Sequence, residues 1–356
     1  MGRRSLSDYC ESTDRTFIFL HNFRAGGNAL YDTFLIHSPC FIFKLGTAGQ
    51  IYNGMAEFIA AAKEKQAKFF FGHFAYGVHT FIETPSSYIT NIRNPTNRLI
   101  SGLGWKKPEE SLEGWLARST ETDNGMTRRL AGIGEKHQGA NDFEHYNFIE
   151  NEKVEFSFKV DESVFEAARN NLINNIYHVY LSEFMEECHV LLEDRLGVFP
   201  IISLRSWGRN SASHNAKAEE LRPEVIETIK ESNIYDQRLY DIAKSIIEKE
   251  LEIQTDDFWE RVRIRRILKN TLGRAAAPRD AKDVLHSVAE GMQRLHFMGM
   301  YREILGIVDL CARDPEFSES FRDILEKIAM KLCPRDVIID FKERQVSTPV
   351  FLFGNP

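Results

Sequence analysis

Short apolar runs recur along the first half of the chain and alternate with stretches of helical periodicity. The runs are rich in β-branched and aromatic residues and are apolar on both faces. They lie at Thr16–His21, Phe41–Leu45, Lys68–Gly72, Tyr88–Arg93 and Ile176–Leu181. Strands of this kind suit a parallel sheet that is buried between two layers of helices.

Helical patterns fill the intervals between these runs. They cover Asn28–Ile36, Asn53–Glu64, Pro95–Leu103, Glu109–Ser119 and Val164–Asn174. Alternation of strand and helix predicts an α/β fold, with an open parallel sheet flanked by helices.

The pattern becomes wholly helical after Leu181. Ser182–Leu196 reads as a helix with Ser182 as N-cap and Gly197 just past its end, and a polar loop follows at Ser203–Lys217. Further helices are predicted at Pro223–Ser232, Asp236–Glu250, Phe258–Asn270, Ala281–Met298, Tyr301–Cys311 and Ser318–Leu332. We therefore expect a flexible N-terminus at 1–15, an α/β domain at 16–255 and a helical C-terminal extension at 256–356.

Composition narrows the function classes. The chain has 43% hydrophobic residues and a formal net charge of −7, without a lysine- or arginine-rich block. Such a chain is a poor candidate for binding nucleic acid or an anionic membrane. The 5 cysteines are scattered without a CxxC pair, which argues against disulfides and against a zinc site. No apolar run is long enough to span a membrane, so we expect a soluble cytoplasmic protein without membrane insertion.

The turn after the first predicted strand is a candidate anion site. In the stretch FIFLHNFRAGGNAL, Arg24 precedes Gly26 and Gly27, and a helix opens near Asn28. Glycines allow backbone amides to approach a ligand, and a helix N-terminus favours an anion. The loop lacks the Lys-Ser/Thr of a Walker A motif, which argues against a nucleotide triphosphatase or kinase. A tight surface turn with an arginine remains the alternative.

Two further strand ends carry candidate residues. Arg93 ends a strand and Ser101 lies two turns into the following helix, so both can converge on one anion; an ion pair for Arg93 is the alternative. His73 follows the strand Lys68–Gly72 and is a candidate proton acceptor near neutral pH. A lone histidine is more often structural, but the carboxyl ends of parallel strands share one edge of the sheet.

Together these segments resemble the sulfotransferase family 2 superfamily, which includes heparan sulfate 2-O-sulfotransferase. The resemblance covers residues 15–253. FLHNFRAGGNAL is similar to the family's 5′-phosphosulfate loop FxHIPKTGGTSL, GHFAYG to its GH-x-x-x-G segment and YITNIRNPTNRLIS to its 3′-phosphate motif YITxLRDPVxRxxS. Three later segments also resemble family blocks: NGMTRRLAG, HVYLSEFMEECHVLLEDRLG and NIYDQRLYDIA.

The resemblance implies a P-loop-like fold and a metal-independent transfer of a sulfuryl group from 3′-phosphoadenosine 5′-phosphosulfate (PAPS) to an acceptor hydroxyl. We expect this hydroxyl to belong to a carbohydrate. By it, His73 is the general base and Arg24 stabilises the developing charge. The implied donor-binding residues are Arg24, Ala25, Gly26, Gly27, Asn28, Ala29, Arg93 and Ser101. Arg24 replaces the family's lysine, and Asn28 and Ala29 replace its two hydroxyl residues.

Several alternatives stay open. His79 is a rival for the base; Arg209 and Asn210 are weaker candidates for donor contact; Arg128 either faces the acceptor or forms a salt bridge. A different function class is a donor-binding protein with little catalysis that acts by interaction, and a P-loop kinase is a third. The acidic chain disfavours a long, highly sulfated polyanion as acceptor, and a small glycan, a lipid-linked sugar or a small-molecule alcohol stays open. The C-terminal helices have three open roles, namely dimerisation, covering the cleft or binding a partner, and the absent anchor suggests a bacterial enzyme.

Overall fold

The structure, a computed structural model, describes residues 3–37, 42–44, 55–73, 75–103, 123–132, 159–198, 200–201, 222–273, 288–289, 291–293, 295–313 and 319–346. The predicted helix at Glu109–Ser119, the loop at Ser203–Lys217 and much of Ala281–Met298 lie outside these ranges.

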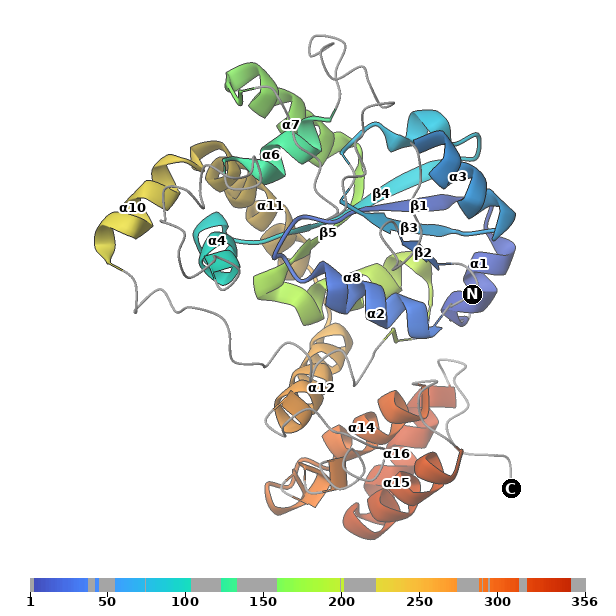
Figure 1. Ribbon diagram of the computed structural model, residues 1–356. Coiled ribbons are helices and arrows are strands. Elements are labelled where there is room, and N and C mark those ends of the chain that lie inside the picture. The colour runs from blue at the N-terminus through green and yellow to red at the C-terminus, as the bar shows by residue number, and fades with distance from the viewer. Residues whose placement is uncertain are drawn as a thin grey trace.

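A parallel sheet forms the centre of the molecule, as the alternating pattern predicts (Figure 1). Its strands are β1 (Thr16–Leu20), β2 (Ile42–Lys44), β3 (Phe69–Gly72), β4 (Ser86–Ile92) and β5 (Ile176–Leu181). The order across the sheet is β2-β3-β1-β4-β5, and every described pairing is parallel. β1 is therefore the central strand, and it is buried along its whole length.

Helices cover both faces of the sheet, which confirms the predicted α/β class (Figure 1). Those of the first 200 residues are α1 (Leu6–Ser12), α2 (Gly27–His37), α3 (Met55–Glu64), η2 (Val78–Phe81), α4 (Pro95–Leu103), α6 (Gly125–Ala131), α7 (Glu162–Asn174), η6 (Ser182–Phe184) and α8 (Met185–Leu196). The later ones are α10 (Pro223–Glu231), α11 (Ile234–Glu252), α12 (Asp256–Gly273), α14 (Tyr301–Arg313), α15 (Glu319–Leu332) and α16 (Arg335–Val346).

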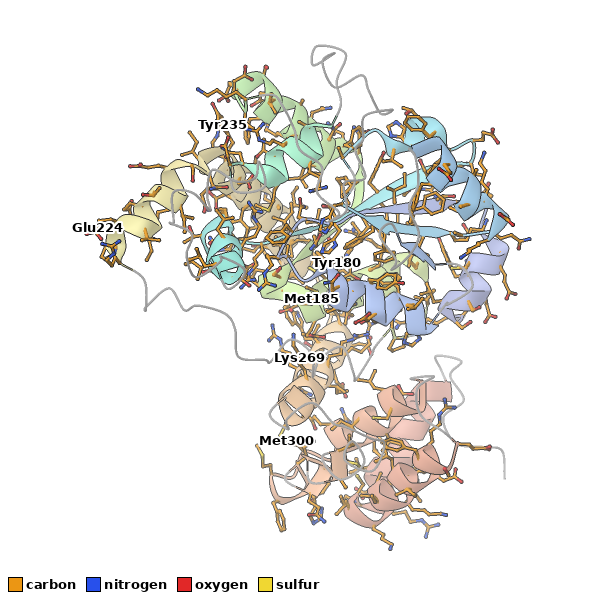
Figure 2. The ribbon with its side chains drawn as sticks, in the orientation of Figure 1. Tyr180, Met185, Glu224, Tyr235, Lys269 and Met300 are labelled. Carbon is orange, nitrogen blue, oxygen red and sulfur yellow. The ribbon has the colours of Figure 1, made fainter. Side chains whose placement is uncertain are left out.

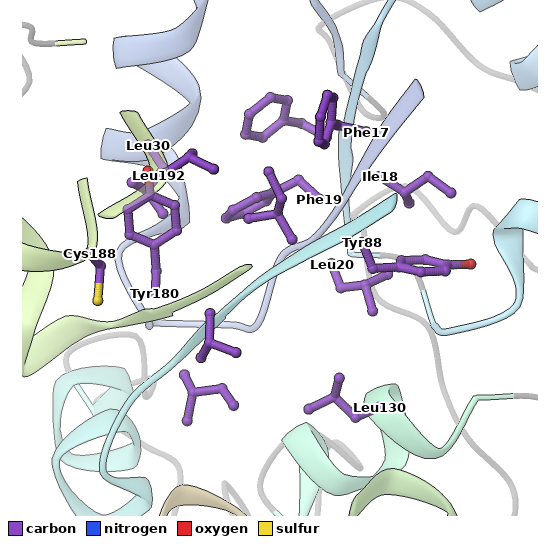
Figure 3. Packing of buried hydrophobic residues seen from close by; sticks show 14 of the residues in the cluster. Phe17, Ile18, Phe19, Leu20, Leu30, Tyr88, Leu130, Tyr180, Cys188 and Leu192 are labelled. Carbon is purple, nitrogen blue, oxygen red and sulfur yellow. The ribbon is translucent and has the colours of Figure 1, made fainter. Parts of the chain in front are cut away.

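Alternate residues of β1 pack against different helix layers (Figure 3). Phe17 and Phe19 stack on the β3 phenylalanines Phe69 and Phe71, with ring centroids 4.9 and 4.7 Å apart, and α2 covers this face. Ile18 and Leu20 point to the opposite face, toward α6 (Figure 3). Aromatic stacking thus follows the β1–β3 pair on this face of the sheet.

Two local features differ from the sequence-based expectation. A helix, α1, lies within the stretch 1–15, because Ser5 and Asp8 form a reciprocal capping box and Cys10 is fully buried. Ser182 is not the N-cap of α8, since it lies in the short η6 turn; Gly197 does end that helix, in the left-handed conformation. The described cysteines, Cys10, Cys188, Cys311 and Cys333, are free thiols.

The helix α12 links two hydrophobic cores. Phe258 and Val262 belong to the core of the sheet, whereas Ile264 belongs to a second core formed with α14 and α15. The other face of α12 meets α8 through ion pairs between the basic residues Arg261, Arg265, Arg266 and Lys269 and the acidic residues Asp194, Glu193, Glu187 and Glu186. The predicted boundary at 255 falls just before this helix.

We expect Arg265→Met to destabilise the chain strongly. Arg265 and Glu193 are each 1% exposed, and removing one partner of a buried ion pair typically costs about 3–5 kcal/mol because the other charge is left uncompensated. Urea unfolding measures the loss. Lys244→Met, which removes an exposed pair with Glu248, is the control and should cost about 0.5 kcal/mol or less. Equal losses for the two variants would contradict the prediction.

We also expect stability to fall below pH 6.5. Burial lowers the pKa of His178 and of His189 well below the ordinary value of 6.5, with help from Arg195 and Arg265 respectively. The folded state keeps both imidazoles neutral while the unfolded chain binds protons, so stability declines as the pH drops below 6.5. Each histidine contributes about 1.4 kcal/mol per pH unit.

Urea unfolding between pH 7.5 and 5.5 tests this prediction. His178→Gln and His189→Gln should each reduce the stability lost between pH 7.5 and 5.5 by about 1.4 kcal/mol relative to the parent chain, because half of this range lies above the ordinary histidine pKa of 6.5. Losses identical to that of the parent would show that these imidazoles do not carry the effect.

Candidate functional site

The order in which strands are added to the sheet changes sides between β1 and β4, although these two strands are parallel neighbours. After β1 it leaves toward β3 and β2, whereas after β4 it continues toward β5 on the other side. Ligands of open α/β sheets bind at such a switch point, in the crevice outside the carboxyl ends of the strands. The topology therefore directs attention to the residues that follow Leu20 and Ile92.

Two asparagines join these strand ends. The Asn22 amide N–H donates to Asn91 Oδ1 at 2.8 Å, and Asn22 Nδ2 donates to the Asn91 carbonyl oxygen at 2.7 Å. Thr90 Oγ1 donates to the Leu20 carbonyl oxygen at 3.0 Å and accepts from Asn22 Nδ2. All three side chains are buried. These hydrogen bonds hold the loop after β1 in place relative to β4.

The loop after β1 needs its small residues. Arg24 and Gly26 have φ angles of 58° and 87°, so the chain turns sharply through the left-handed region. Gly27 opens α2 directly against the His21 ring, and a Cβ added at Gly27 would collide with that ring. Ala25 is fully buried, and its carbonyl oxygen accepts from Ser182 Oγ at 3.0 Å.

Arg24, Arg93 and Ser101 come together beside this loop. Arg93 Nη1 donates to the Arg24 carbonyl oxygen at 3.1 Å, and Arg24 Nη2 donates to the Ser101 carbonyl oxygen at 2.5 Å. Burial lowers the pKa of both guanidiniums; the charge of Arg93 lowers that of Arg24 further, while Glu183 partly offsets the effect at Arg93. Two neighbouring, partly desolvated cations are stabilised by an anion between them.

The start of α2 adds backbone donors to the same place. The Ala29 and Leu30 amides bond to the Gly26 carbonyl oxygen, so Gly26 caps the helix. The amides of Gly27 and Asn28 precede any possible intrahelical acceptor, and the positive end of the helix dipole lies there. Asn28 is exposed and Ala29 is partly exposed. The arrangement is a candidate anion site, here called the anion cradle, made of two guanidiniums and a helix terminus.

His73 lies at the same edge, directly after β3. Its Nδ1 is 2.8 Å from the His21 carbonyl oxygen, and its ring stacks on the His21 ring with centroids 4.3 Å apart. A carbonyl oxygen only accepts, so Nδ1 carries the proton and Nε2 of the neutral ring carries the lone pair. His73 is partly exposed, which is compatible with proton exchange with a bound molecule.

His79, the rival base, lies elsewhere. Its Nδ1 is 2.7 Å from Tyr88 Oη, which also accepts the amide protons of Gly77 and His79. With both lone pairs engaged, the Tyr88 hydroxyl donates to the imidazole. Tyr88 pairs with Ile18 in the middle of the sheet, not at its carboxyl edge, and burial lowers the pKa of His79. This histidine thus anchors the GHFAYG segment on β4.

Two of the later motifs meet in a buried network. Asp236, on α11, accepts from the amides of Met126 and Thr127, from Thr127 Oγ1 and from Arg98 Nη2. Asn124 Oδ1 accepts from the amides of Tyr235 and Asp236. The network joins α4, α6 and α11 behind the site, which gives the segments NGMTRRLAG and NIYDQRLYDIA a structural role.

Arg128 forms the salt bridge that was one of its two alternatives, with Asp123 Oδ2 at 2.7 Å, and is buried. Arg209 and Asn210 lie outside the described residues. The sequence pattern gave no role to His21, Asn22 or Asn91, and it gave Ser182 only the role of a helix N-cap. Their position at strand ends was the signal for these residues, but their mutual contacts depend on the strand order.

Within the described parts of the chain, no three His, Cys, Asp or Glu side chains are grouped so as to hold a metal ion. Among the described helices, none combines the length and the apolar character needed to cross a bilayer.

No family model matches this chain, and no curated protein matches it either. The contacts described above are therefore the basis for the function proposed below.

We expect Arg24→Met and Arg93→Met each to weaken the binding of inorganic pyrophosphate about tenfold or more. Hydrogen bonds to charged groups contribute about 1.5–3 kcal/mol, and each substitution removes one of the paired cations. Isothermal titration calorimetry measures the change. Arg15→Met is the matched control, because Arg15 bonds to Ser87 Oγ near the opposite end of β4. An equal loss with Arg15→Met would indicate a general charge effect and not a site.

Proposed function

We propose that this protein is a sulfotransferase that transfers a sulfuryl group from PAPS to an acceptor hydroxyl. The observation that carries the proposal is that Arg24, Arg93 and His73 all follow the carboxyl ends of adjacent strands, with Arg93 bonded to the Arg24 carbonyl oxygen. The α2 N-terminus joins them, because Gly27 packs against the His21 ring that stacks on His73. A group with several negative charges and a proton acceptor are what such a transfer requires. The ordered motifs that resemble sulfotransferase family 2 support the same function, and the proposal includes a P-loop-like fold for the parallel sheet.

The residues present suit the two ends of this donor. The α2 amides of Gly27 and Asn28, with Arg24, would hold the 5′-phosphosulfate, as helix N-termini commonly hold phosphate groups. Arg93 and Ser101 would hold the 3′-phosphate. Arg24 contacts Ser101, and Arg93 contacts Arg24. These contacts would let the 5′-phosphosulfate and the 3′-phosphate of the donor bind to one connected set of residues. Burial of both guanidiniums strengthens their interaction with an anion.

The proposed chemistry is an in-line displacement in which the chain supplies a base and a cation. His73 Nε2 accepts the proton of the acceptor hydroxyl while the acceptor oxygen forms its bond to sulfur. The bond between sulfur and the 5′-phosphate oxygen breaks, and the negative charge that develops on that oxygen is stabilised by Arg24 and the helix amides. The products are the sulfated acceptor and 3′-phosphoadenosine 5′-phosphate.

A second candidate is a protein that binds this donor without efficient transfer and acts by interaction. It is favoured by the contact of Arg24 Nη2 with a backbone carbonyl, which would have to be exchanged for the transferring group, and by the lack of hydroxyls at Asn28 and Ala29. Arginine also presents its charge as a planar fork, unlike lysine. A small glycan or small-molecule alcohol is the proposed acceptor, and the bacterial cytoplasm the proposed compartment.

Calorimetry and a transfer assay separate these candidates. We expect 3′-phosphoadenosine 5′-phosphate to bind without magnesium, more tightly than adenosine 5′-phosphate, and radiolabelled sulfuryl to move from PAPS to members of a panel of glycans and alcohols. Binding without transfer to any acceptor supports the second candidate. Absence of binding rejects both, and magnesium-dependent binding of ATP instead would favour a kinase.

His73→Ala should lower turnover about a hundredfold or more, which is the usual scale for loss of a general base, and should leave the affinity for 3′-phosphoadenosine 5′-phosphate within about twofold. His79→Ala is the matched control: it should alter thermal stability through Tyr88 and leave turnover of the folded fraction nearly unchanged. Turnover that responds to His79→Ala and not to His73→Ala would reverse the assignment of the base.

A further inference from the structure

We propose that His21 is a positioning residue for His73, with its carbonyl oxygen selecting the tautomer of His73 and its ring holding the imidazole in place. The inference deepens the proposed function, since it concerns how the proposed base is prepared. It rests on the stacked pair of rings and on the contact between His73 Nδ1 and the His21 carbonyl oxygen.

The backbone of His21 supplies the first half of the device. β1 ends at Leu20, and the His21 amide still donates to the Gly72 carbonyl oxygen of β3 at 2.9 Å. This bond sets the His21 carbonyl beside the residue that follows Gly72, which is His73. The 2.8 Å contact then places the proton of His73 on Nδ1, so Nε2 is the atom that accepts a proton.

The ring of His21 supplies the second half. The two imidazole planes are inclined by only 19°, with centroids 4.3 Å apart, so rotation of His73 about its χ2 angle would break the stack. Two imidazolium ions cannot share such a contact without repulsion. His21 is 8% exposed whereas His73 is partly exposed, so His73 is the ring of the pair that a bound molecule can reach.

The anion cradle fixes the position of His21 in turn. Gly27, the first residue of α2, lies against the His21 ring so closely that no Cβ fits between them. The backbone donors at the start of α2 and the His21 ring that stacks on His73 therefore pack directly against each other. Other charged groups at this edge include Arg24 and Arg93, which bond to the carbonyl oxygens of Ser101 and Arg24, and Glu183, whose charge acts on Arg93.

Nuclear magnetic resonance of ¹⁵N-histidine-labelled protein tests the tautomer without any assay of function. We expect neutral His73 to be the Nδ1–H form in the parent chain and in His21→Phe, which keeps a flat ring. His21→Ala should give a mixture of tautomers, because the imidazole is then free to rotate away from the carbonyl oxygen. An unchanged Nδ1–H population in His21→Ala would overturn the role of the ring, and an Nε2–H form in the parent would overturn that of the carbonyl.

Kinetics supply the second readout. His21→Ala should lower kcat about tenfold to a hundredfold, the scale expected when a catalytic group is misplaced by about 1 Å, while KM for PAPS changes less than about threefold. His21→Phe should retain kcat within about threefold. Thermal denaturation establishes that each variant is folded. Equal kcat values for His21→Ala and the parent would overturn the proposal.

Gly27→Ala provides an independent route to the same displacement. It should push the His21 ring from the stack and mix the His73 tautomers, and in the His21→Ala background the added methyl should have no further effect on the tautomers. Additive effects of the two substitutions would contradict the packing argument. If the parent shows no sulfuryl transfer, the proposed function fails while the resonance experiments still decide the role of His21.

Discussion

The hydrogen-bonding of β1 to β3 on one side and to β4 on the other is the constraint on which the site depends. Because the three strands are parallel, their carboxyl ends coincide, and the residues that follow them meet although they lie about 20 to 70 positions apart in the chain. His21, His73 and Arg93 are brought together in this way. The side-chain bonds between Asn22 and Asn91 continue the strand pairing beyond its last backbone bond and so extend the rigid sheet into the loop.

The molecule separates its charges between two places. At the strand edge, Arg24 and Arg93 lie close together under partial burial, which lowers the pKa of each and leaves their interaction strong for an incoming anion. Along α8, the acidic residues are neutralised by α12, and Lys269 on α12 bonds to Glu186, next to Met185 (Figure 2). A chain with a net charge of −7 can thus maintain a cationic edge.

This separation also explains the position of α12. A helix with basic residues on one face and apolar residues on another joins the sheet to the second core, so the C-terminal helices are connected to α8 by charge as well as by packing. Met185, at the start of α8, lies next to Gly26 in the cradle, with its terminal carbon 3.1 Å from the position of an added Cβ. The helix that α12 stabilises is therefore also a wall of the anion site.

The sequence by itself determined the elements. Strands such as Thr16–Leu20 are apolar on both faces and bounded by turn residues, so their local pattern identifies them, and the glycines and arginine of the first loop identify an anion site from local chemistry. Only the tertiary structure decided which residues surround that site. Whether Arg128 faces an acceptor or pairs with Asp123, and whether His73 or His79 shares the edge with Arg24, depends on the tertiary contacts and the strand order. Those contacts are packing and hydrogen-bonding choices, which leave no periodic signal in the sequence.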